Sequence, residues 1–405
     1  MIKTAVLGYG TVGSGVVKVF DVNKDAIAGR IGDTVEVKYI LDLREFPGDP
    51  NSHKVVHDYE VILNDPEIRV IAEVMGGVEP AHTFVKKALM AGKSAVTSNK
   101  EMVALYGAEL LAVAREHHVN FLFEASVGGG IPVIRPLTQA LLADQFEEVT
   151  GILNGTTNYM LTKMDAEGAD YDTVLKQAQD NGYAERHPEA DVEGFDACRK
   201  IAILTSLVCG RQVNYEEIPT EGITKITETD FKYADALGAG IKLLGTSRMT
   251  PEGVFAKVSP VLIPESHPLY PVRDVFNAIL VKGNMLGDVM FYGKGAGSEP
   301  TASAVVSDML TCLRYEGCTL PIRWAAEAQP LADPKKFPSR FLVRVKGDPQ
   351  ARAEDVRALF GDVSICTPEG VEGEFAVLTR EMTLGEAEEA CEKLEGFAGR
   401  LFADL

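Results

Sequence analysis

Short apolar runs alternate with helical patterns over residues 1–130. The apolar runs predict strands, and the spaced apolar positions between them predict helices. Strands that alternate with helices are typical of βαβ units, so we predict an α/β domain with a parallel sheet. The predicted strands are 2–7, 35–41, 70–74, 95–97 and 120–124, and the predicted helices start at residue 13 or span 80–91 and 102–117.

The pattern becomes mixed after the glycines at 128–130, which indicates an α+β unit. A polar, proline-rich stretch at 329–340 predicts a linker. Beyond it, the order βαββαβ within about 65 residues predicts a small separate domain. The predicted strands are 148–153, 254–262, 278–281, 341–345, 363–366, 374–378 and 400–402, and the predicted helices lie near 171–180, 196–209, 353–360 and 384–394.

Acidic residues outnumber basic ones by 59 to 40 in this 405-residue chain, which gives a formal net charge of −19. Nucleic acids and anionic membranes both attract basic surfaces, so this charge excludes them as partners. No run approaches the ~20 apolar residues of a membrane span, and the N-terminus lacks the pattern of a signal peptide. We therefore expect a soluble, cytoplasmic protein.

The six cysteines form no CxxC pair, and the histidines show no HExxH spacing. The cysteine pattern therefore favours reduced thiols over a zinc site or a disulfide framework.

The first chemical motif is Gly8-Tyr9-Gly10-Thr11-Val12-Gly13, between a predicted strand and a predicted helix. Glycines at this spacing allow a tight turn and let backbone N–H groups reach a pyrophosphate at the helix N-terminus. The context therefore favours a dinucleotide site over an ordinary glycine-rich turn.

The end of the second predicted strand carries two candidates for ribose recognition, Asp42 and Arg44. A carboxylate accepts hydrogen bonds from the ribose hydroxyls of NAD, whereas an arginine favours the extra phosphate of NADP. Asp42 lies 29 residues after Gly13, further than the usual ~20. The residues favour NAD slightly and leave NADP open, and both side chains could equally be solvated loop charges.

Ser98 and Lys100 follow a short predicted strand, at the sheet edge where ligands bind in such folds. Lys100 could meet the nicotinamide or a substrate carboxylate, or be an ordinary surface lysine.

Asp196 and Lys200 are four residues apart, so they share one face of a predicted helix. Spacing alone favours a surface ion pair. However, the helix continues into the apolar residues 201–204, and a lysine entering a buried helix beside an aspartate could serve as an acid or base.

Two further turns carry small polar or glycine residues. Gly155 and Thr156 in the run Asn154–Asn158 suit a polar ligand, and Gly297 precedes a predicted helix where a cofactor could approach closely. Each turn could equally be a plain loop-to-helix junction.

These motifs, in this order, resemble those of the homoserine dehydrogenase family. The most specific stretch is Ala178-x3-Gly182-Tyr183-Ala184, followed by Pro188, Asp191, Gly194, Asp196 and Lys200. The stretches TSNKEMVA, EASVGGGIPVI, NGTTNY and YGKGAGSEPTASAVVSD support the resemblance, which runs from residue 1 to about 325. His187 departs from the Asp, Asn or Ser usual before the proline, and we expect it to adjust the loop without removing activity.

The resemblance implies that L-homoserine and L-aspartate 4-semialdehyde are interconverted with NAD or NADP, a step toward threonine, methionine and isoleucine. Lys200 would donate the proton to the aldehyde oxygen, and Lys100 would be a second active-site lysine. Glu185, Asp191 and Asp196 would hold the amino acid or orient the lysines, with Glu185 facing the substrate ammonium.

The resemblance also implies where the cofactor and a cation would bind. A sodium-type site would fall on Glu124 and on the carbonyls of Val127, Gly129 and Ile131, since hard oxygen ligands suit such a cation. The residues that would line the cofactor are Gly8, Gly10, Thr11, Val12, Gly13, Asp42, Arg44, Ser98, Lys100, Gly182 and Gly297.

Three domains follow from the resemblance: a Rossmann-type NAD(P) domain (1–130 plus about 295–328), a catalytic and dimerisation domain (131–294) and an ACT-like domain (340–405). The family implies a homodimer or homotetramer. Related C-terminal domains bind an effector, often threonine, at a turn that carries Pro-Gly, but this chain has Pro349-Gln350. Threonine regulation and a purely oligomeric role are therefore alternatives.

Two rival functions stay open. A sugar or inositol dehydrogenase has a similar layout but tends to carry Glu-Lys-Pro where this chain has Asn99-Lys100-Glu101. A non-catalytic cofactor-binding sensor would not need to retain Lys100, Asp196 and Lys200 together.

Overall fold

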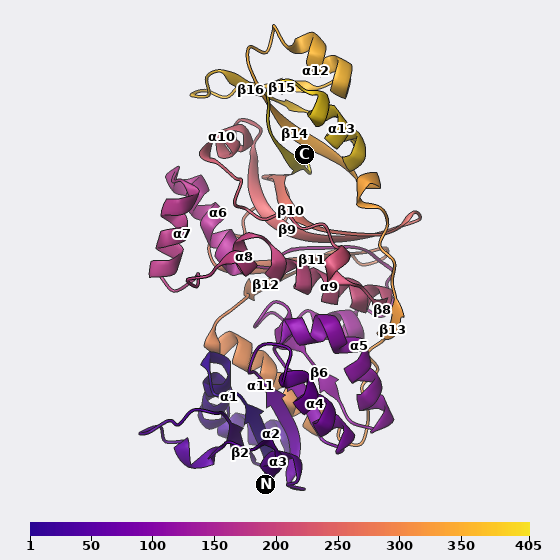
Figure 1. Cartoon of the computed structure of the whole chain (residues 1–405). Helices are drawn as coiled ribbons and strands as arrows, with labels where there is room; N and C mark the ends of the chain where they lie inside the picture. Colours follow the sequence, from indigo (N-terminus) through magenta and orange to yellow (C-terminus); the bar gives the residue numbers. More distant parts are fainter. The chain divides into compact units, whose positions relative to one another are not determined.

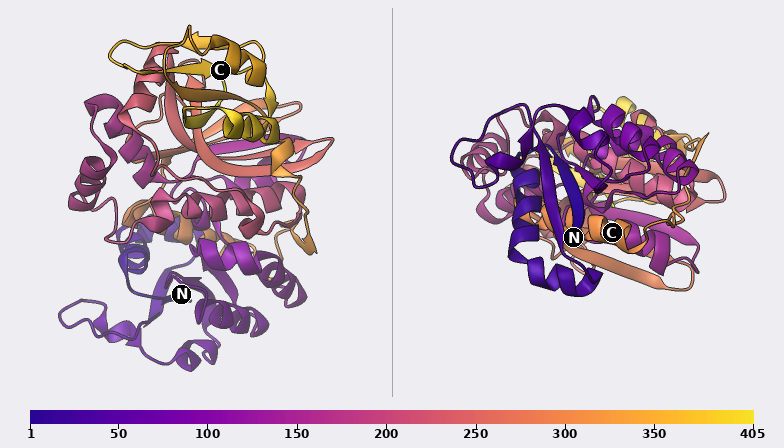
Figure 2. Two further views of the ribbon diagram at one scale, coloured as in Figure 1. Left: turned by 45° about the horizontal axis from the view of Figure 1, so that its top comes forward. Right: turned by 90° about the horizontal axis from the view of Figure 1, so that it is seen from below.

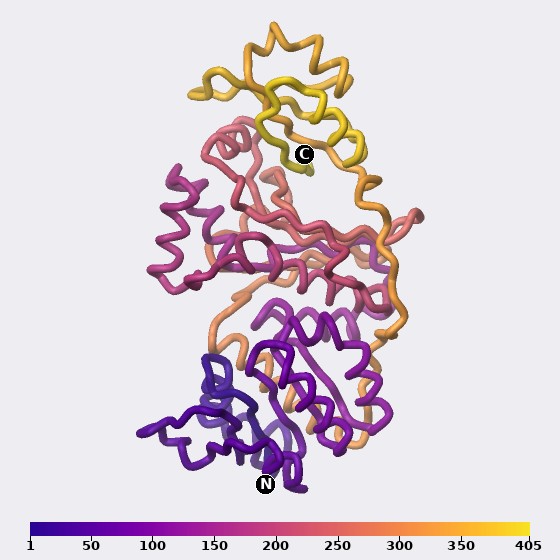
Figure 3. The backbone as a smooth tube through the Cα atoms, in the orientation of Figure 1, coloured from indigo at the N-terminus to yellow at the C-terminus, as the bar shows by residue number.

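The computed structural model describes all 405 residues, which cluster into two compact units. The first unit comprises residues 1–144, 202–215 and 291–329, and the second comprises 145–201, 216–290 and 330–405. Figure 3 traces the orange segment that returns to the first unit and ends at residue 329. None of the helices combines the length and apolar character needed to cross a bilayer.

The core of the first unit is a six-stranded parallel sheet in the order β3-β2-β1-β4-β5-β6. This order is that of dinucleotide-binding sheets, with the switch point between β1 and β4. The five predicted strands are confirmed, and β3 is an addition too short to give a pattern. The bounds are β1 Ile2–Leu7, β2 Val35–Leu41, β3 Val55–Val56, β4 Ile68–Glu73, β5 Ser94–Thr97 and β6 Phe121–Leu122.

Helices of the first unit connect these strands, and one more arrives from far along the chain (Figure 1). Helix α11 packs against α1 and against β4 and β5. A short parallel pair, β8 with β13, also belongs to this unit. The bounds are α1 Thr11–Val22, α2 Lys24–Ile31, α3 Tyr59–Leu63, α4 Ala81–Met90, α5 Lys100–Glu116, α11 Ser298–Arg314, β8 Arg211–Gln212 and β13 Ala325–Ala328.

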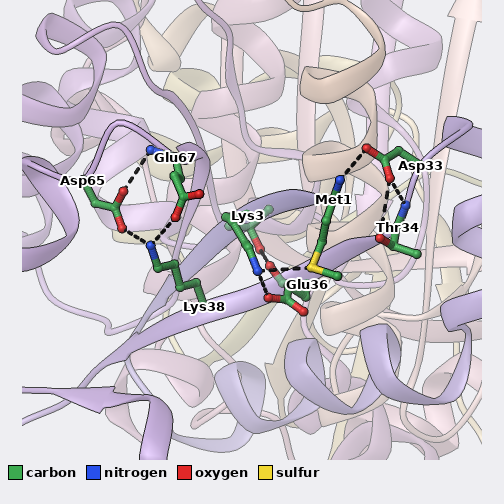
Figure 4. Close-up of polar contacts among 9 residues, drawn as sticks. Met1, Lys3, Asp33, Thr34, Glu36, Lys38, Asp65 and Glu67 are labelled. Atoms are coloured by element: carbon green, nitrogen blue, oxygen red, sulfur yellow. Dashed lines mark hydrogen bonds and ion pairs between the residues drawn. The ribbon is translucent and has the colours of Figure 1, made fainter.

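Ion pairs connect charged groups around β1 and β2 (Figure 4). The ammonium of Lys38 lies 2.5 Å from the carboxylates of both Asp65 and Glu67, and the terminal amine of Met1 lies 2.7 Å from Asp33. Such partly exposed pairs typically contribute about 0–1 kcal/mol each. We therefore assign them to local charge balance in this acidic chain.

The second unit is built on a ten-stranded mixed sheet with the path β12-β11-β7-β9-β10-β18-β14-β16-β15, in which β17 pairs with β14. Five strands form its first part, and five helices accompany them. The bounds are β7 Phe146–Ile152, β9 Ala239–Thr250, β10 Gly253–Pro264, β11 Phe276–Gly283, β12 Gly287–Lys294, α6 Gly155–Glu167, α7 Tyr171–Asp180, α8 Glu189–Val192, α9 Phe195–Cys209 and α10 Glu228–Ala236.

Helix α9 approaches the sheet very closely at Gly245 of β9. A Cβ atom at Gly245 would lie 2.8 Å from the Leu153 side chain and 3.2 Å from Cβ of Ile201. Only glycine leaves room for this contact. The helix starts in the second unit and continues into the first as buried residues, as its apolar run predicted.

Residues 338–405 form what we call the C-terminal module (Figure 2, yellow). Its strand order, β18-β14-β16-β15, and its element order βαββαβ are those of a ferredoxin-like unit. Strand β18 pairs in parallel with β10 at Val261 and Leu262, so the module extends the sheet of the second unit. The bounds are β14 Pro338–Lys346, α12 Ala353–Phe360, β15 Ser364–Cys366, β16 Glu374–Leu378, β17 Met382–Thr383, α13 Leu384–Lys393 and β18 Phe397–Ala403.

The predicted linker at 329–340 is wrong in one respect, because two of its residues pack against the unit. Leu331 forms a bridge with Val254 of β10, and Phe337 is a buried core residue. Polar composition misled the prediction, since two apolar residues in the stretch are enough to fix it against the sheet.

Candidate active site

The turn between β1 and α1 has the geometry that a dinucleotide needs. Gly8 has φ +99°, a conformation that other residues rarely adopt. A Cβ atom at Gly13 would lie 1.9 Å from the carbonyl oxygen of Gly8, so strand and helix approach as closely as the backbone allows. Gly10 is exposed at the helix start, and nothing lies within 4 Å of where its Cβ would be. The turn therefore leaves backbone open to a pyrophosphate.

Asp42, directly after β2, accepts hydrogen bonds from two sides. The N–H of Tyr9 donates to it at 2.8 Å, and Arg44 donates through its backbone N–H and its guanidinium at 2.9–3.0 Å. The guanidinium beside Asp42 holds the pKa of that carboxyl well below its usual range. Asp42 therefore stays ionised, and it fixes both the glycine-rich turn and Arg44.

A cleft of about 460 Å³ opens beside this turn. The cleft brings together four of the predicted cofactor residues with aromatic and apolar neighbours, as expected of a nucleotide site. Its lining residues are Gly8, Tyr9, Gly10, Leu41, Asp42, Leu43, Arg44, His57, Tyr59, Val74, Met75, Pro80 and Phe84.

Two residues from far along the chain meet the start of α1. Ser298 donates from its hydroxyl to the carbonyl of Thr11 at 2.6 Å, and Gly297 precedes it with φ +116°. A Cβ atom at Gly15 would lie 2.7 Å from the Ser298 hydroxyl. The structure thus brings Gly297 to the same helix start as Thr11 and Val12.

The loop after β5 holds the predicted Ser98 and Lys100. Asn99 caps α5 by accepting from the N–H of Met102 at 3.1 Å, and Lys100 is the first helical residue, half buried. Ser98 is half buried as well.

Glu73, at the end of β4, is a residue that the sequence did not single out. It is fully buried, it accepts from the hydroxyl of Thr97 at 2.5 Å and from the N–H of Met75 at 2.8 Å, and burial raises its pKa. Glu73 therefore braces the two loops at the carboxyl edge of the sheet, a role that no local pattern reveals.

The turn proposed for a cation contains a buried Glu124. Its carboxylate accepts three backbone N–H groups, those of Val133 and Ile134 at 2.6–2.7 Å and that of Arg135 at 2.8 Å, and burial raises its pKa. These bonds occupy the side chain, and the main-chain carbonyl of Glu124 accepts the N–H of Val127 at 3.4 Å.

The other three cation residues, Val127, Gly129 and Ile131, are buried. No N–H or O–H of the chain donates to their carbonyl oxygens. Buried carbonyls without donors are uncommon, and they match the hard oxygen ligands that an alkali cation prefers. The residues present therefore fit such a cation through the main chain.

Lys200 and Asp196 meet on α9 in the second unit, as their spacing predicted. The ammonium of Lys200 lies 2.7 Å from Oδ2 of Asp196 and 2.8 Å from the carbonyl oxygen of Leu153. Both side chains are buried, with 9% and 3% of their surfaces exposed. A surface ion pair is thereby excluded.

Asn154, the residue before α6, joins this pair to a second carboxylate. Its amide donates to Asp191 at 2.7 Å and to Asp196 at 2.9 Å, while its oxygen accepts from the N–H of Thr157 and caps the helix. In the sequence, Asn154 lies in a run that suits a polar ligand or forms a turn and helix cap. Its bonds to residues 37 and 42 positions away could not be read from a local pattern.

The first turn of α6 holds Gly155 and Thr156. A Cβ atom at Gly155 would lie 2.8 Å from the carbonyl oxygen of Val275, so the turn packs tightly on its neighbour. The Thr156 hydroxyl donates to the carbonyl of Tyr183 at 2.7 Å. The backbone N–H groups of Gly155 and Thr156 have no acceptor within the chain.

The loop from Gly182 to His187 is exposed. Gly182 has φ +73° and ends the turn after α7, and Glu185 lies on the surface with its carbonyl accepting from Gln179. His187 is exposed, and its ring lies 3.8 Å from Glu189. The structure thus leaves the Glu185 carboxylate and the His187 ring at the surface, and the cofactor role of Gly182, which lies in the second unit, stays a prediction.

Two family models match the chain. One, described as homoserine dehydrogenase, NAD binding domain, matches residues 8–124, and the other, described as homoserine dehydrogenase, matches residues 132–310. The chain is 44% identical to the homoserine dehydrogenase of Bacillus subtilis over 317 residues, which are 77% of this chain and 73% of that protein. It is 46% identical to that of Synechocystis sp. over 318 residues, 76% and 72% respectively.

Solved structures give the same result. A homoserine dehydrogenase from Thiobacillus denitrificans superposes with a TM-score of 0.91 at 35% identity, covering 100% of this chain and 98% of that one. One from S. aureus gives 0.83 at 32%, with 100% and 98% covered. A hyperthermophilic archaeal homoserine dehydrogenase in complex with NADPH gives 0.64 at 26%, with 77% and 97% covered.

Proposed function

The chain belongs to the homoserine dehydrogenase family, and we propose that Lys200 is the proton donor of its reaction. The enzyme interconverts L-homoserine and L-aspartate 4-semialdehyde with NAD or NADP, a step toward threonine, methionine and isoleucine. When bound, the cofactor supplies the hydride for reduction of the aldehyde. The residues of the chain hold the aldehyde in place and protonate its oxygen.

The observation that carries this proposal is the count of donors on Lys200. An ammonium has three N–H groups, and two of those on Lys200 donate to the Leu153 carbonyl oxygen and to the Asp196 carboxylate. The third is left for the aldehyde oxygen. As the C–H bond forms, negative charge develops on that oxygen, and the adjacent ammonium both stabilises it and transfers a proton to it.

Asp196 and Asn154 orient the lysine. The Asp196 carboxylate pairs with the ammonium in a buried position, where an unpaired cation would be costly. Asn154 holds Asp196 and Asp191 with one amide group, so both carboxylates are tied to the start of α6. We assign Lys100, the first residue of α5, as the second active-site lysine.

The amino acid needs partners for both of its charges. The N–H groups of Gly155 and Thr156 stand at the positive end of α6, which favours the substrate carboxylate. Asp191 and the exposed Glu185 offer negative charge to the substrate ammonium. These four residues and Lys200 make up the proposed substrate site.

For the cofactor, we propose that the turn from Gly8 to Gly13 holds the pyrophosphate and that Asp42 accepts from the ribose in place of one of its four hydrogen bonds from Tyr9 and Arg44. The Arg44 guanidinium is engaged by Asp42, so the pair offers little net charge to an extra phosphate. This argument favours NAD over NADP. Ser98, Lys100, Gly182 and Gly297 complete the proposed cofactor lining.

We further propose that a monovalent cation such as sodium binds at Glu124 and the carbonyls of Val127, Gly129 and Ile131. The unsatisfied main-chain oxygens of that turn support the assignment. The cation would fix the turn that lies between residues 8–124 and 132–310, the two segments that the family models match.

Assembly is proposed to be a homodimer or homotetramer. Strand β12 is an edge of the large sheet, and exposed apolar side chains gather at it, with Met285 84% and Met290 41% exposed. Exposed edges with apolar side chains are typical interaction surfaces. We also propose the three domains predicted above and an ACT-like identity for the C-terminal module. A cytoplasmic location completes the proposal, because it suits six reduced cysteines.

The test follows the absorbance of the reduced nicotinamide after addition of L-homoserine, with NAD and NADP compared at equal concentration. We expect saturable turnover, and higher kcat/KM with NAD. Myo-inositol, as the control substrate, should give no turnover. Turnover with inositol and none with homoserine would contradict the assignment.

A further inference from the structure

A cavity of about 150 Å³ that is partly open to solvent lies in the second unit, between β10 and the C-terminal module. It exists because β18 pairs with β10 only at Val261 and Leu262, so the two strands diverge beyond that point. The earlier half of β10, the helix α13 and the residues around 219–221 enclose the space. The side chains used below are Phe255, Lys257, Phe337, Glu388, Arg400 and Phe402.

Lys257 of β10 is a buried cation without a carboxylate partner. Only 8% of its surface is exposed, its ammonium donates to the Ser259 hydroxyl at 2.7 Å, and no carboxylate lies within 4.0 Å of it. The ammonium lies 3.7 Å from the ring centroid of Phe402 and 5.4 Å from that of Phe337. Buried lysines are almost always paired, so this one lacks a counter-ion.

Arg400 of β18 is a second cation that lines this cavity without an ion-pair partner. Its guanidinium lies 5.1 Å from the rings of Phe341 and Phe402, its Nη1 atom is buried without any acceptor, and it forms no ion pair. Arg400 and Phe402 are two residues apart on a strand and share a face. Two cations without an ion-pair partner therefore line one cavity, and both lie close to the ring of Phe402.

The remaining walls restrict what could occupy the space. Phe255, Phe337 and Phe402 make much of it apolar, and a cavity of this size accepts a group about as large as benzene. Glu221 and Glu388 also line it, beyond ion-pair distance of either cation. Their charges disfavour a dianion such as phosphate but tolerate a single negative charge.

We propose that this cavity binds a small organic monocarboxylate, with its carboxylate between Lys257 and Arg400 and its apolar part against Phe255, Phe337 and Phe402. The site belongs to different elements from those that carry Lys200, and it does not rest on the proposed function. The ligand would supply the counter-ion that both cations lack.

The test is calorimetric titration of the full-length protein in a buffer free of carboxylates, at a pH below 7 where the Lys257 ammonium is mostly charged. The probes are benzoate and isovalerate, and the controls are their neutral amides of nearly equal shape, benzamide and isovaleramide. We expect one saturable carboxylate site per chain and at least ~10-fold weaker binding of the amides, since a missing charge pair costs about 1.4 kcal/mol or more.

Three variants locate the site. Lys257→Met and Arg400→Met should each weaken benzoate binding by ~10-fold or more, whereas Lys242→Met should leave it unchanged. Lys242 is the matched control, because it is a buried lysine on β9 whose ammonium donates to the carbonyl of Val272 away from the cavity. Methionine retains the length of lysine without its charge, so the variants are expected to fold.

No saturable binding of either carboxylate, equal binding of the amides, or full binding by both Lys257→Met and Arg400→Met would overturn the proposal. The titration involves no turnover. Its failure would therefore leave the role of Lys200 untouched, and an inactive enzyme could still bind benzoate.

Discussion

The side chain of Asn154 serves three groups at once, because its amide donates to Asp191 and Asp196 while its oxygen accepts from the N–H of Thr157. Local spacing was enough to identify the glycine motif and to pair Asp196 with Lys200, because both features lie within six residues. The contacts of Asn154 and of Glu73 depend on loops that meet only after folding. Residues of that kind are outside the reach of pattern-based prediction.

Replacement of Asn154 by alanine should affect both stability and activity. The change removes a helix cap, worth about 1 kcal/mol, and it removes the donor shared by Asp191 and Asp196. We expect kcat/KM for homoserine to fall by ~10–100-fold, about 1.4–2.7 kcal/mol, measured by steady-state kinetics.

Asp170→Ala is the matched control for this variant. Asp170 caps α7 by accepting from the N–H of Thr173 at 2.9 Å, and it has no bond to Lys200, Asp191 or Asp196. The Asp170→Ala variant should lose a similar amount of stability and keep the wild-type kcat/KM. Equal kinetic losses in the two variants would show that Asn154 acts only as a cap.

Lys257 predicts an unusual dependence of stability on pH. Burial lowers its pKa to about 7 from an ordinary 10.5; Arg248 and Arg400 lower it further, and Asp404 and Glu148 oppose them. Between these two values the unfolded chain binds the proton that the folded protein has lost, so this residue makes stability rise with pH. Below about pH 7 the full free-energy cost of burying the charged Lys257 is present.

Lys257→Met should therefore stabilise the protein most below pH 7, on the order of a few kcal/mol, with the gain shrinking toward pH 10.5. Urea unfolding at several pH values, in buffers free of carboxylates, measures the difference between variant and wild type. A gain that did not change with pH would contradict the buried, titrating lysine.

Among the elements, β9 is the clearest one that the sequence did not predict. Its run from Ala239 to Thr250 contains two glycines and Lys242, which break both the alternating and the continuous apolar pattern. The strand is nevertheless buried over most of its length, because helices cover one face and the C-terminal module contributes to the other. Gly245 is required by the neighbouring helix, a reason that only tertiary structure supplies.

Gly245→Ala tests this packing. The added Cβ would press on Leu153 and Ile201, so α9 would have to shift, and we expect a loss of about 1–3 kcal/mol in the free energy of unfolding. Because α9 carries Lys200, kcat should fall as well. Denaturant unfolding and steady-state kinetics measure the two effects.

The control for that variant is Gly29→Ala in α2. Nothing lies within 4 Å of where its Cβ would be, so it should gain up to about 1 kcal/mol from helix propensity and keep full activity. If Gly245→Ala behaved in the same way, the close approach of α9 and β9 would be wrong.

At the scale of the whole molecule, composition predicted a large acidic protein, and the structure indicates how such a chain handles anions. A net charge of −19 repels phosphate at long range, yet the cleft proposed for the cofactor combines the glycine-rich turn with one paired charge of each sign, Asp42 and Arg44. The predicted α/β fold and the βαββαβ module are confirmed. The continuity of that module with the sheet of the second unit was not predicted, since strand pairing across 140 residues leaves no local pattern.

The central claim is that Lys200 donates the proton, and the kcat of Lys200→Met for reduction of L-aspartate 4-semialdehyde tests it most directly. We expect kcat to fall by ~10²–10⁴-fold while KM changes by less than ~3-fold, as for loss of a general acid, with Lys242→Met at the wild-type rate. Thermal unfolding of both variants confirms that they are folded. A folded Lys200→Met enzyme with kcat within ~2-fold of wild type would contradict the account.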